Sequence, residues 1–273
     1  VGPMKRLDGR VAVVTGAGSG IGRATSLALA ERGCSIAAID VQSDGAEETA
    51  DLVRSLGTRA SVHLADVRDP ARIDELPVEV EDSLGPCQIL VNNAGVTAAG
   101  AFADEAIDDL RWIVDINVWG VVHGCRAFLP MLRQADEAHI VNMSSMVGLL
   151  GLPHNVSYSL TKGAVRAFSE ALRAELVATQ VGVTVVFPGA IHTNITAGAR
   201  GGQAARLAEM GQSRLAPYVM RPPSAVARRI VSAIERDRAR VVVGPDAHVV
   251  SALSRVLPGR SGLVGRLTNR LDR

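Results

Sequence analysis

Two side chains four residues apart could exchange a proton with a substrate. Tyr158 and Lys162 form a Tyr-x-x-x-Lys pattern, and Lys162 is one of only two lysines in a chain that is rich in arginine. On a helix, positions i and i+4 share a face, so the ammonium group would lie close to the phenol. A nearby cation favours the phenolate and lowers a tyrosine pKa below its ordinary value of about 10, toward the range of acid–base catalysis. Taken alone, such a pair is more often an ordinary feature of a helix surface, so its meaning depends on the rest of the chain.

A glycine-rich turn near the start of the chain could hold a phosphate group. A β-branched run ends at Thr15, and Gly16, Gly18, Gly20 and Gly22 open the helical pattern that follows. Glycines at a strand-to-helix turn allow a ligand to approach the backbone closely, and the helix N-terminus favours negative charge. Glycines also occur in tight turns for steric reasons alone, but this position between a strand and a helix indicates a pyrophosphate site of a dinucleotide.

The second predicted strand ends at Asp40, about twenty residues beyond the glycines. A carboxylate at this point can accept hydrogen bonds from both ribose hydroxyls of NAD and would repel the 2′-phosphate of NADP. Ser19 within the turn and Val41 and Gln42 after Asp40 are uncharged, which also favours NAD. The alternative interpretation is that Asp40 only caps the next helix.

Length and composition are compatible with one large α/β domain or two small ones and indicate no strongly charged partner. The 273 residues carry a formal net charge of +1 and 47% are hydrophobic, so the chain can bury a full core and nothing points to nucleic acid. Cys34, Cys87 and Cys125 are far apart, which favours reduced thiols and a cytoplasmic location. We expect a soluble protein, because no apolar run approaches the ~20 residues of a membrane span. Residues 1–3, before Met4, resemble the remnant of an expression tag.

Short apolar runs alternate with helical patterns along the chain. Seven runs have the character of buried parallel strands, and helices are predicted between them, including a long helical stretch from about Asp104 to Leu132. This alternation predicts a Rossmann-type, doubly wound parallel α/β sheet in a single domain over 4–245, with ligands beyond the carboxyl ends of the strands. The predicted strands are 10–15, 35–40, 59–64, 88–91, 139–143, 182–187 and 240–243.

The chain resembles the short-chain dehydrogenase/reductase family in motifs that follow the family's order from residue 7 to about 245. Residues 92–95 match the family's Asn-Asn-Ala-Gly, and Ser145, thirteen residues before Tyr158, matches its catalytic serine in preference to Ser144. The other matches are Thr15, Gly16, Gly20 and Gly22 for Thr-Gly-x-x-x-Gly-x-Gly, Asn117 for a helical asparagine, Tyr158 and Lys162 for Tyr-x-x-x-Lys, and Pro188, Gly189 and Thr193 for Pro-Gly-x-x-x-Thr.

The resemblance implies an enzyme with Asn117, Ser145, Tyr158 and Lys162 as catalytic residues. Tyr158 would transfer a proton, Ser145 would stabilise charge on the substrate oxygen, and Lys162 would hold the nicotinamide ribose and favour the phenolate. Asn117 would hold a water that links Lys162 to solvent. The residues expected to bind NAD are Gly16, Ser19, Gly20, Ile21, Gly22, Asp40, Asp66, Val67, Asn93, Ala94, Gly95, Tyr158, Lys162, Pro188, Gly189, Ile191 and Thr193.

The substrate is expected to contact Ser145, Val147, His154 and Tyr158. Apolar residues follow Ser145, and a predicted lid over 190–222 contains Met210, Tyr218 and Met220. These features favour a hydrophobic secondary alcohol or ketone, such as a steroid, a terpenoid or a lipid-derived compound, although the apolar residues after Ser145 could equally serve packing.

The residues after 245 form a basic amphipathic extension, 246–273. It could lie on a membrane surface or, as we prefer, pack against a neighbouring subunit, and the resemblance implies a homotetramer or homodimer. The six histidines lack the spacing of a zinc site, so no metal is expected. An NADPH-dependent ketone or 3-oxoacyl reductase is one alternative, against which Asp40 argues. An NAD-binding regulatory protein without turnover is another, against which the complete catalytic set argues.

Overall fold

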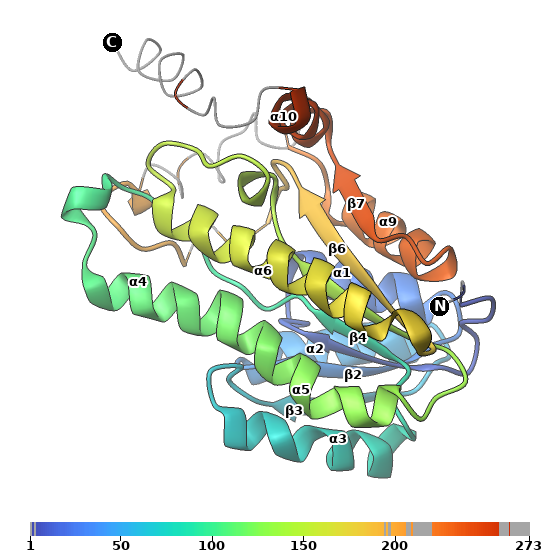
Figure 1. Ribbon diagram of the computed structural model, residues 1–273. Coiled ribbons are helices and arrows are strands. Elements are labelled where there is room, and N and C mark those ends of the chain that lie inside the picture. Colours follow the sequence, from blue (N-terminus) through green and yellow to red (C-terminus); the bar gives the residue numbers. More distant parts are fainter. Residues whose placement is uncertain are drawn as a thin grey trace.

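Seven parallel strands form one sheet in the computed structural model, which describes residues 2, 4–193, 195, 198–205, 209, 220–256 and 262. The strand order is β3-β2-β1-β4-β5-β6-β7, so the chain starts at the centre, moves to one edge and then fills the other half (Figure 1). The predicted Rossmann-type α/β sheet is confirmed. The strands are β1 (Val11–Thr15), β2 (Ser35–Asp40), β3 (Ala60–Leu64), β4 (Ile89–Asn92), β5 (Ala138–Met143), β6 (Val181–Pro188) and β7 (Arg240–Val243).

Helices cover both faces of the sheet (Figure 1). On one face α1, α2 and α9 pack over Ala12 and Val14 of β1. On the other face α3, α5 and α6 pack over Val11 and Val13. Alternate residues of β1 point into two separate cores, which explains why this strand is apolar at successive positions. These helices are α1 (Gly20–Ala30), α2 (Ser43–Ser55), α3 (Pro70–Leu84), α5 (Gly120–Leu132), α6 (Val156–Glu175) and α9 (Pro223–Glu235).

The long helical stretch predicted over 104–132 is divided in the structure. A 3₁₀ turn (Phe102–Asp104) precedes α4 (Ile107–Val114), and a π-helical turn (Asp115–Trp119) joins α4 to α5. Asn117, within the π turn, accepts a hydrogen bond from the Val96 N–H at 2.8 Å and donates one to the Val96 carbonyl oxygen at 2.9 Å. A π turn adds a residue to the helix and re-aims the side chains around it. Here it brings Asn117 against the loop that follows β4.

The chain continues beyond β7 into α10 (Pro245–Val256), which packs against β7 and the 3₁₀ helix at Met146–Gly148. Ala247 and Ser251 on α10 are buried, so the first part of the predicted extension is packed into the fold. Its remainder lies outside the described residues except for residue 262, and so do 206–208 and 210–219 of the predicted lid, with Met210 and Tyr218. In the described part of the chain, no helix is long and apolar enough to cross a bilayer, and no cluster of His, Cys, Asp and Glu could hold a metal ion.

Candidate active site

A cleft of about 850 Å³ opens at the carboxyl ends of the strands. Ligands of doubly wound sheets bind at this edge. The predicted site residues that line it are Gly16, Ser19, Gly20, Ile21, Asp40, Asp66, Val67, Asn93, Ala94, Gly95, Ser145, Val147, Tyr158, Lys162, Pro188, Gly189, Ile191 and Thr193. Gly22, Asn117 and His154 were also predicted, and they do not line it.

The glycine turn is held in place by the loop after β4. The Asn93 side chain donates to the carbonyl oxygens of Thr15 and Gly16 at 3.0 and 3.1 Å, and the Thr15 hydroxyl accepts from the Asn93 and Ala94 N–H groups. Gly16 has a φ of +62°, and a Cβ on Gly22 would collide with the Gly16 carbonyl oxygen. The absence of a side chain at Gly22 therefore leaves room for the Gly16 carbonyl oxygen. Ser19, before α1, makes no side-chain cap, which leaves the first N–H groups of α1 available to an anion.

Asp40 borders the cleft at the end of β2. Its two carboxylate oxygens accept hydrogen bonds from the N–H groups of Gly18 at 2.8 Å and Gln42 at 3.0 Å. Each oxygen can accept a further bond, so these contacts orient the carboxylate and leave capacity for ribose hydroxyls. The contact with Gln42 also ties Asp40 to the start of α2. Arg23 lies nearby, but its guanidinium donates to the Gly18 carbonyl oxygen at 2.6 Å and to Glu48 at 2.7 Å, so its charge is already paired.

Asp66 and Val67 line the cleft together with Arg68, a residue that no motif marks. The Arg68 guanidinium lies 2.5 Å from Asp66, and its hydrogen bond lowers the pKa of that carboxyl. The Val67 carbonyl oxygen accepts a hydrogen bond from His123 Nδ1 at 2.9 Å. The backbone at this end of the cleft is thus fixed against α5. Arg68 lies beside the two residues predicted to contact the adenine.

Ser144 and Ser145 follow β5 and face different partners. The Ser145 hydroxyl accepts from the Val147 N–H at 3.4 Å and lies beside the phenol of Tyr158, whose pKa it lowers. The Ser144 hydroxyl is buried and donates to the Lys162 carbonyl oxygen at 2.7 Å, which ties β5 to α6. The serine in contact with Tyr158 is therefore Ser145.

Burial dominates the ionisation of Tyr158 and Lys162. It raises the pKa of Tyr158 to about 12, which the neighbouring Ser145 hydroxyl offsets only in part, and it lowers the pKa of Lys162 to about 8. The Lys162 ammonium donates to the Met143 carbonyl oxygen at 2.9 Å and lies 5.7 Å from the centroid of the Tyr158 ring. The expectation that Lys162 lowers the pKa of the phenol is not met in this arrangement, because desolvation of the phenolate is the main cause of the shift and only Ser145 opposes it.

Asn117 lies next to Lys162 in the fold but does not line the cleft. Its side chain is fully buried and, besides Val96, contacts the Thr161 hydroxyl at 3.1 Å. A Cβ on Gly95 would lie 3.1 Å from Asn117 Oδ1 and 3.4 Å from Lys162 Nζ. Gly95 thus allows the π turn and Lys162 to approach one another closely.

His154, predicted to touch the substrate, does not line the cleft. Its backbone has a φ of +59°, and its carbonyl oxygen accepts a hydrogen bond from the Gly100 N–H at 2.9 Å. Its neighbours Leu152 and Asn155 line the cleft. Residues 151–155 are irregular, so no periodicity in the sequence could show which side chain faces inward.

The described base of the predicted lid is attached to the loop after β4 and to α4. Arg200 forms a parallel bridge with Ala98, and its guanidinium lies 4.1 Å from the centroid of the Trp112 ring and 3.1 Å from Asp109. Trp112 lines the cleft. Arg200 therefore fixes one wall of the cleft, a contact that only the tertiary structure reveals.

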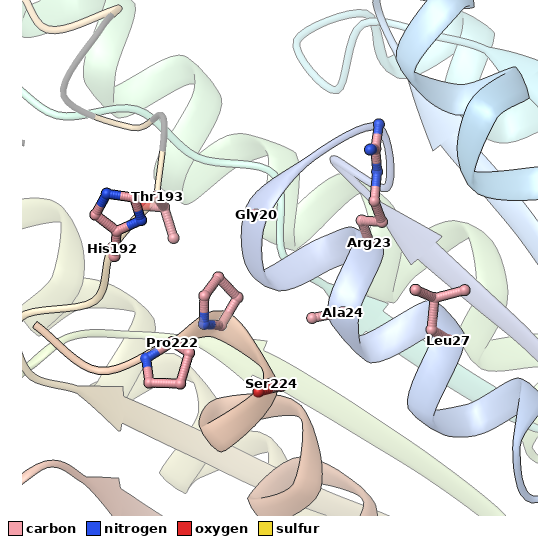
Figure 2. A pocket seen from close by; sticks show the side chains of 9 residues that line it. Gly20, Arg23, Ala24, Leu27, His192, Thr193, Pro222 and Ser224 are labelled. Atoms are coloured by element: carbon pink, nitrogen blue, oxygen red, sulfur yellow. The ribbon is translucent and has the colours of Figure 1, made fainter. Parts of the chain in front are cut away.

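A second hollow, of about 390 Å³, adjoins the glycine turn (Figure 2). Figure 2 shows Leu27 of α1 on one side and His192 and Pro222 on the other. Gly20 and Thr193 line both cavities, so this hollow adjoins the edge of the main cleft. Ser145, Tyr158 and Lys162 line the main cleft and not this hollow.

The donors and acceptors of the cleft fit a dinucleotide. The glycine turn and the uncapped start of α1 suit a pyrophosphate, the Asp40 carboxylate suits a ribose diol, and the Lys162 ammonium suits a second ribose. A Cβ would fill the turn at Gly16, where it would come within 2.9 Å of the Ala94 Cα.

Known proteins of similar sequence are oxidoreductases by name. The family model described as short chain dehydrogenase matches residues 10–204. SadH of Mycobacterium tuberculosis, whose name describes it as an oxidoreductase, is 38% identical over 259 residues, which cover 93% of each chain. The ketoacyl reductase HetN of Nostoc is 30% identical over 241 residues, which cover 88% of this chain and 80% of HetN.

Solved structures of this family have the same fold. A short-chain dehydrogenase/reductase from Burkholderia phymatum in complex with NAD superposes with a TM-score of 0.85 at 30% identity, covering 93% of this chain and 95% of that chain. A short-chain dehydrogenase from Mycobacterium paratuberculosis bound to NAD gives 0.78 at 28% identity, covering 89% and 98%. The resemblance found in the motifs is confirmed, and this chain belongs to the short-chain dehydrogenase/reductase family of oxidoreductases, which use a nicotinamide cofactor.

Proposed function

We propose that this oxidoreductase transfers a hydride between NAD(H) and a secondary alcohol or the matching ketone. The observation that carries the proposal is the position of Ser145, Tyr158 and Lys162 in one cleft with Asp40. The two hydroxyls are in contact with each other, and Lys162 is the buried cation beside them. A bound nicotinamide supplies the hydride acceptor or donor.

Tyr158 and Ser145 share the oxygen atom of the substrate. In oxidation, Tyr158 acts in its phenolate form, and the alcohol proton passes to the phenolate oxygen as the carbon loses its hydride. In reduction, Tyr158 gives its proton to the ketone oxygen as the carbon gains the hydride. The Ser145 hydroxyl donates a hydrogen bond to the same oxygen and stabilises the negative charge that develops there. Lys162 binds the nicotinamide ribose, and Asn117 holds the loop at Val96 and the neighbouring Thr161 in place around it.

Asp40 supports NAD rather than NADP as the cofactor. Its carboxylate is oriented by Gly18 and Gln42, and the nearby Arg23 is paired with Glu48. A 2′-phosphate at this place would meet the negative charge of Asp40, whereas a ribose diol would donate to it. The structures from Burkholderia phymatum and Mycobacterium paratuberculosis were solved with NAD, which agrees with this preference.

A hydrophobic substrate, such as a steroid, a terpenoid or a lipid-derived compound, fits the lining of the cleft. Beyond Ser145 and Tyr158, the walls include the apolar side chains of Trp112, Ile116, Met146, Val147, Leu152, Ile195 and Met220. Burial of an apolar substrate against such walls contributes about 25 cal/mol per Å². The alternative is a ketone or 3-oxoacyl reductase that uses NADPH, which the 30% identity to the ketoacyl reductase HetN favours.

A fluorescence titration with NADH and NADPH tests the cofactor. We expect the wild type to bind NADH more tightly than NADPH, and Asp40→Ala to lose most of that preference. A preference of the wild type for NADPH would support the reductase alternative. Assays with alcohols of increasing apolar length then test the substrate class, and activity confined to small polyols would contradict it. Binding of NADH without turnover of any alcohol or ketone would favour a regulatory protein.

A homo-oligomer, a tetramer or a dimer, is part of the proposal. Trp119 in the π turn and Leu160 and Val156 on α6 are 51%, 52% and 44% exposed, and α6 packs alongside the π turn. Exposed apolar side chains on neighbouring elements suit a subunit interface. We expect Trp119→Glu to produce a smaller species in gel filtration, and an unchanged elution volume would contradict this interface.

Three buried free cysteines support a reducing compartment, which we propose to be the cytoplasm.

A further inference from the structure

We propose that Asp246, on the first turn of α10, is a positioning residue for the nicotinamide half of the cofactor site. Its Oδ2 atom accepts a hydrogen bond from the Ala190 N–H at 2.6 Å. Ala190 belongs to the segment 188–193 that follows β6 and lines the cleft. The inference rests on the proposed function, because it takes that segment as the binding site of the nicotinamide.

Two glycines make room for the Asp246 carboxylate. A Cβ on Gly189 or on Gly244 would collide with its Oδ1 atom. Gly244 also has a φ of +107°, which lets the chain turn from β7 directly into α10. Two positions on different segments are therefore shaped around one carboxylate.

Asp246 does more than stabilise the start of its own helix. An acidic residue in a first turn stabilises a helix through its dipole, and this effect needs no contact with another segment. The Asp246 side chain instead bonds Ala190, 56 positions earlier in the chain. The contact therefore orients the peptide between Gly189 and Ala190.

Three backbone hydrogen bonds hold the segment besides the contact with Asp246. The Gly189 N–H donates to Val243, the Ala190 carbonyl oxygen accepts from Arg221 and the His192 N–H donates to Arg221, at 2.8, 3.0 and 2.9 Å. With Asp246 bound to Ala190, the N–H of Ile191 is left without an acceptor among the residues that the structure describes. Ile191 lines the cleft. The segment thus keeps a backbone donor for the ligand and fixes the peptides on either side of it.

Helix α10 also packs against the segment that follows Ser145, on the substrate side of the site. Val250 on α10 packs against a core cluster formed by Leu149, Val185 and Phe187, and α10 also contacts the 3₁₀ helix that follows Ser145. Asp40, in contrast, lies on β2, in the other half of the sheet. Loss of the Asp246 contact should therefore disturb the nicotinamide end of the site and leave the adenosine end unchanged.

Two ligands separate these ends. NADH occupies the whole site, whereas ADP-ribose lacks the nicotinamide. In Asp246→Ala we expect NADH to bind about tenfold more weakly, with the affinity for ADP-ribose changed by less than about twofold. Asp246→Asn keeps an acceptor oxygen and should recover most of the NADH affinity. Asp246→Ser, which keeps a small polar group near the start of α10, provides the same measurement if the alanine variant does not fold.

Asp237→Asn is the matched control. Asp237 also approaches a glycine, because a Cβ on Gly182 would lie 2.6 Å from its Oδ1, and it pairs with Arg173 at 2.8 Å. It precedes β7, whereas Asp246 follows it. This variant should lose stability, while its affinities for NADH and ADP-ribose should change by the same factor.

The inference is overturned if folded Asp246→Ala or Asp246→Ser binds NADH as tightly as the wild type, or if it loses NADH and ADP-ribose affinity to the same extent. The proposed function fails separately, and the inference with it, if the wild type binds neither NADH nor NADPH. If the wild type turns over a substrate and the Asp246 variants bind NADH with normal affinity, the proposed function is retained. The role of Asp246 in it is then contradicted.

Discussion

The ammonium group of Lys162 lies 5.7 Å from the ring centroid of Tyr158, and its hydrogen bond goes to the Met143 carbonyl oxygen. Lys162 is 4% exposed, so the fold holds a cation in a place that disfavours charge. The pKa of Lys162 falls from 10.5 to about 8 for this reason. The chain thus accepts a cost in stability to keep a lysine beside the phenol.

Replacing Lys162 by methionine should remove that cost together with the activity. Because the pKa of Lys162 is lower in the folded state, the unfolded chain binds more protons between pH 8 and 10.5, and the stability of the wild type rises with pH over this window. Relative to Lys162→Met, the wild type should therefore gain up to about 3 kcal/mol between pH 8 and 10.5. Urea unfolding of both proteins across this range measures the difference, and a difference that does not change with pH would contradict the prediction.

The two neighbouring serines should separate catalysis from stability. Ser145→Ala removes the hydroxyl in contact with Tyr158 and should lower kcat by about 10²–10³ while NADH binding stays within about threefold. Ser144→Ala removes a buried bond to the Lys162 carbonyl oxygen and should cost about 1 kcal/mol of unfolding free energy with a smaller change in kcat. Steady-state kinetics and urea unfolding on both variants test this. A larger loss of kcat in Ser144→Ala than in Ser145→Ala would contradict the assignment of the catalytic role to Ser145.

His139 should make the protein sensitive to acid. Thr184 uses its proton on the Arg238 carbonyl oxygen at 2.6 Å, so the His139 Nε2 donates to Thr184 at 2.7 Å. Burial lowers the pKa of His139 to about 4, which Asp237 offsets only in part. The unfolded chain therefore binds more protons between pH 4 and 6.5, and stability is lost as the pH falls through this window.

Relative to His139→Gln, the wild type should lose about 3 kcal/mol of unfolding free energy between pH 6.5 and 4. Thermal or urea unfolding at pH 7, 6, 5 and 4 gives the comparison. Parallel pH profiles for the two proteins would show that the pKa of His139 is the same in the folded and unfolded states, and would contradict the prediction.

The features that the sequence predicts well are local. The apolar run of β1, the glycines after it and Asp40 at the end of β2 each follow from backbone rules that act within a few residues. Their assembly in one cleft follows from the parallel order of the strands. The fold and most of the candidate cleft residues were therefore accessible before the structure.

The features that the sequence does not predict depend on partners distant along the chain. Asn117 in the π turn hydrogen-bonds Val96, and the Asp246 carboxylate hydrogen-bonds Ala190. The raised pKa of Tyr158 is a consequence of burial, which spacing along a helix cannot show. Periodicity places a side chain on a face, but it does not place one in an irregular loop such as the one at His154.

The most direct test of the proposed mechanism is the substitution Tyr158→Phe, measured on a secondary alcohol that the wild type oxidises. The ring stays in place, so NADH should bind with an affinity within about threefold of the wild type, while kcat falls by at least about 10²-fold because the proton acceptor is lost. Turnover by Tyr158→Phe at a rate close to that of the wild type would contradict the account, because another group would then have to transfer the proton.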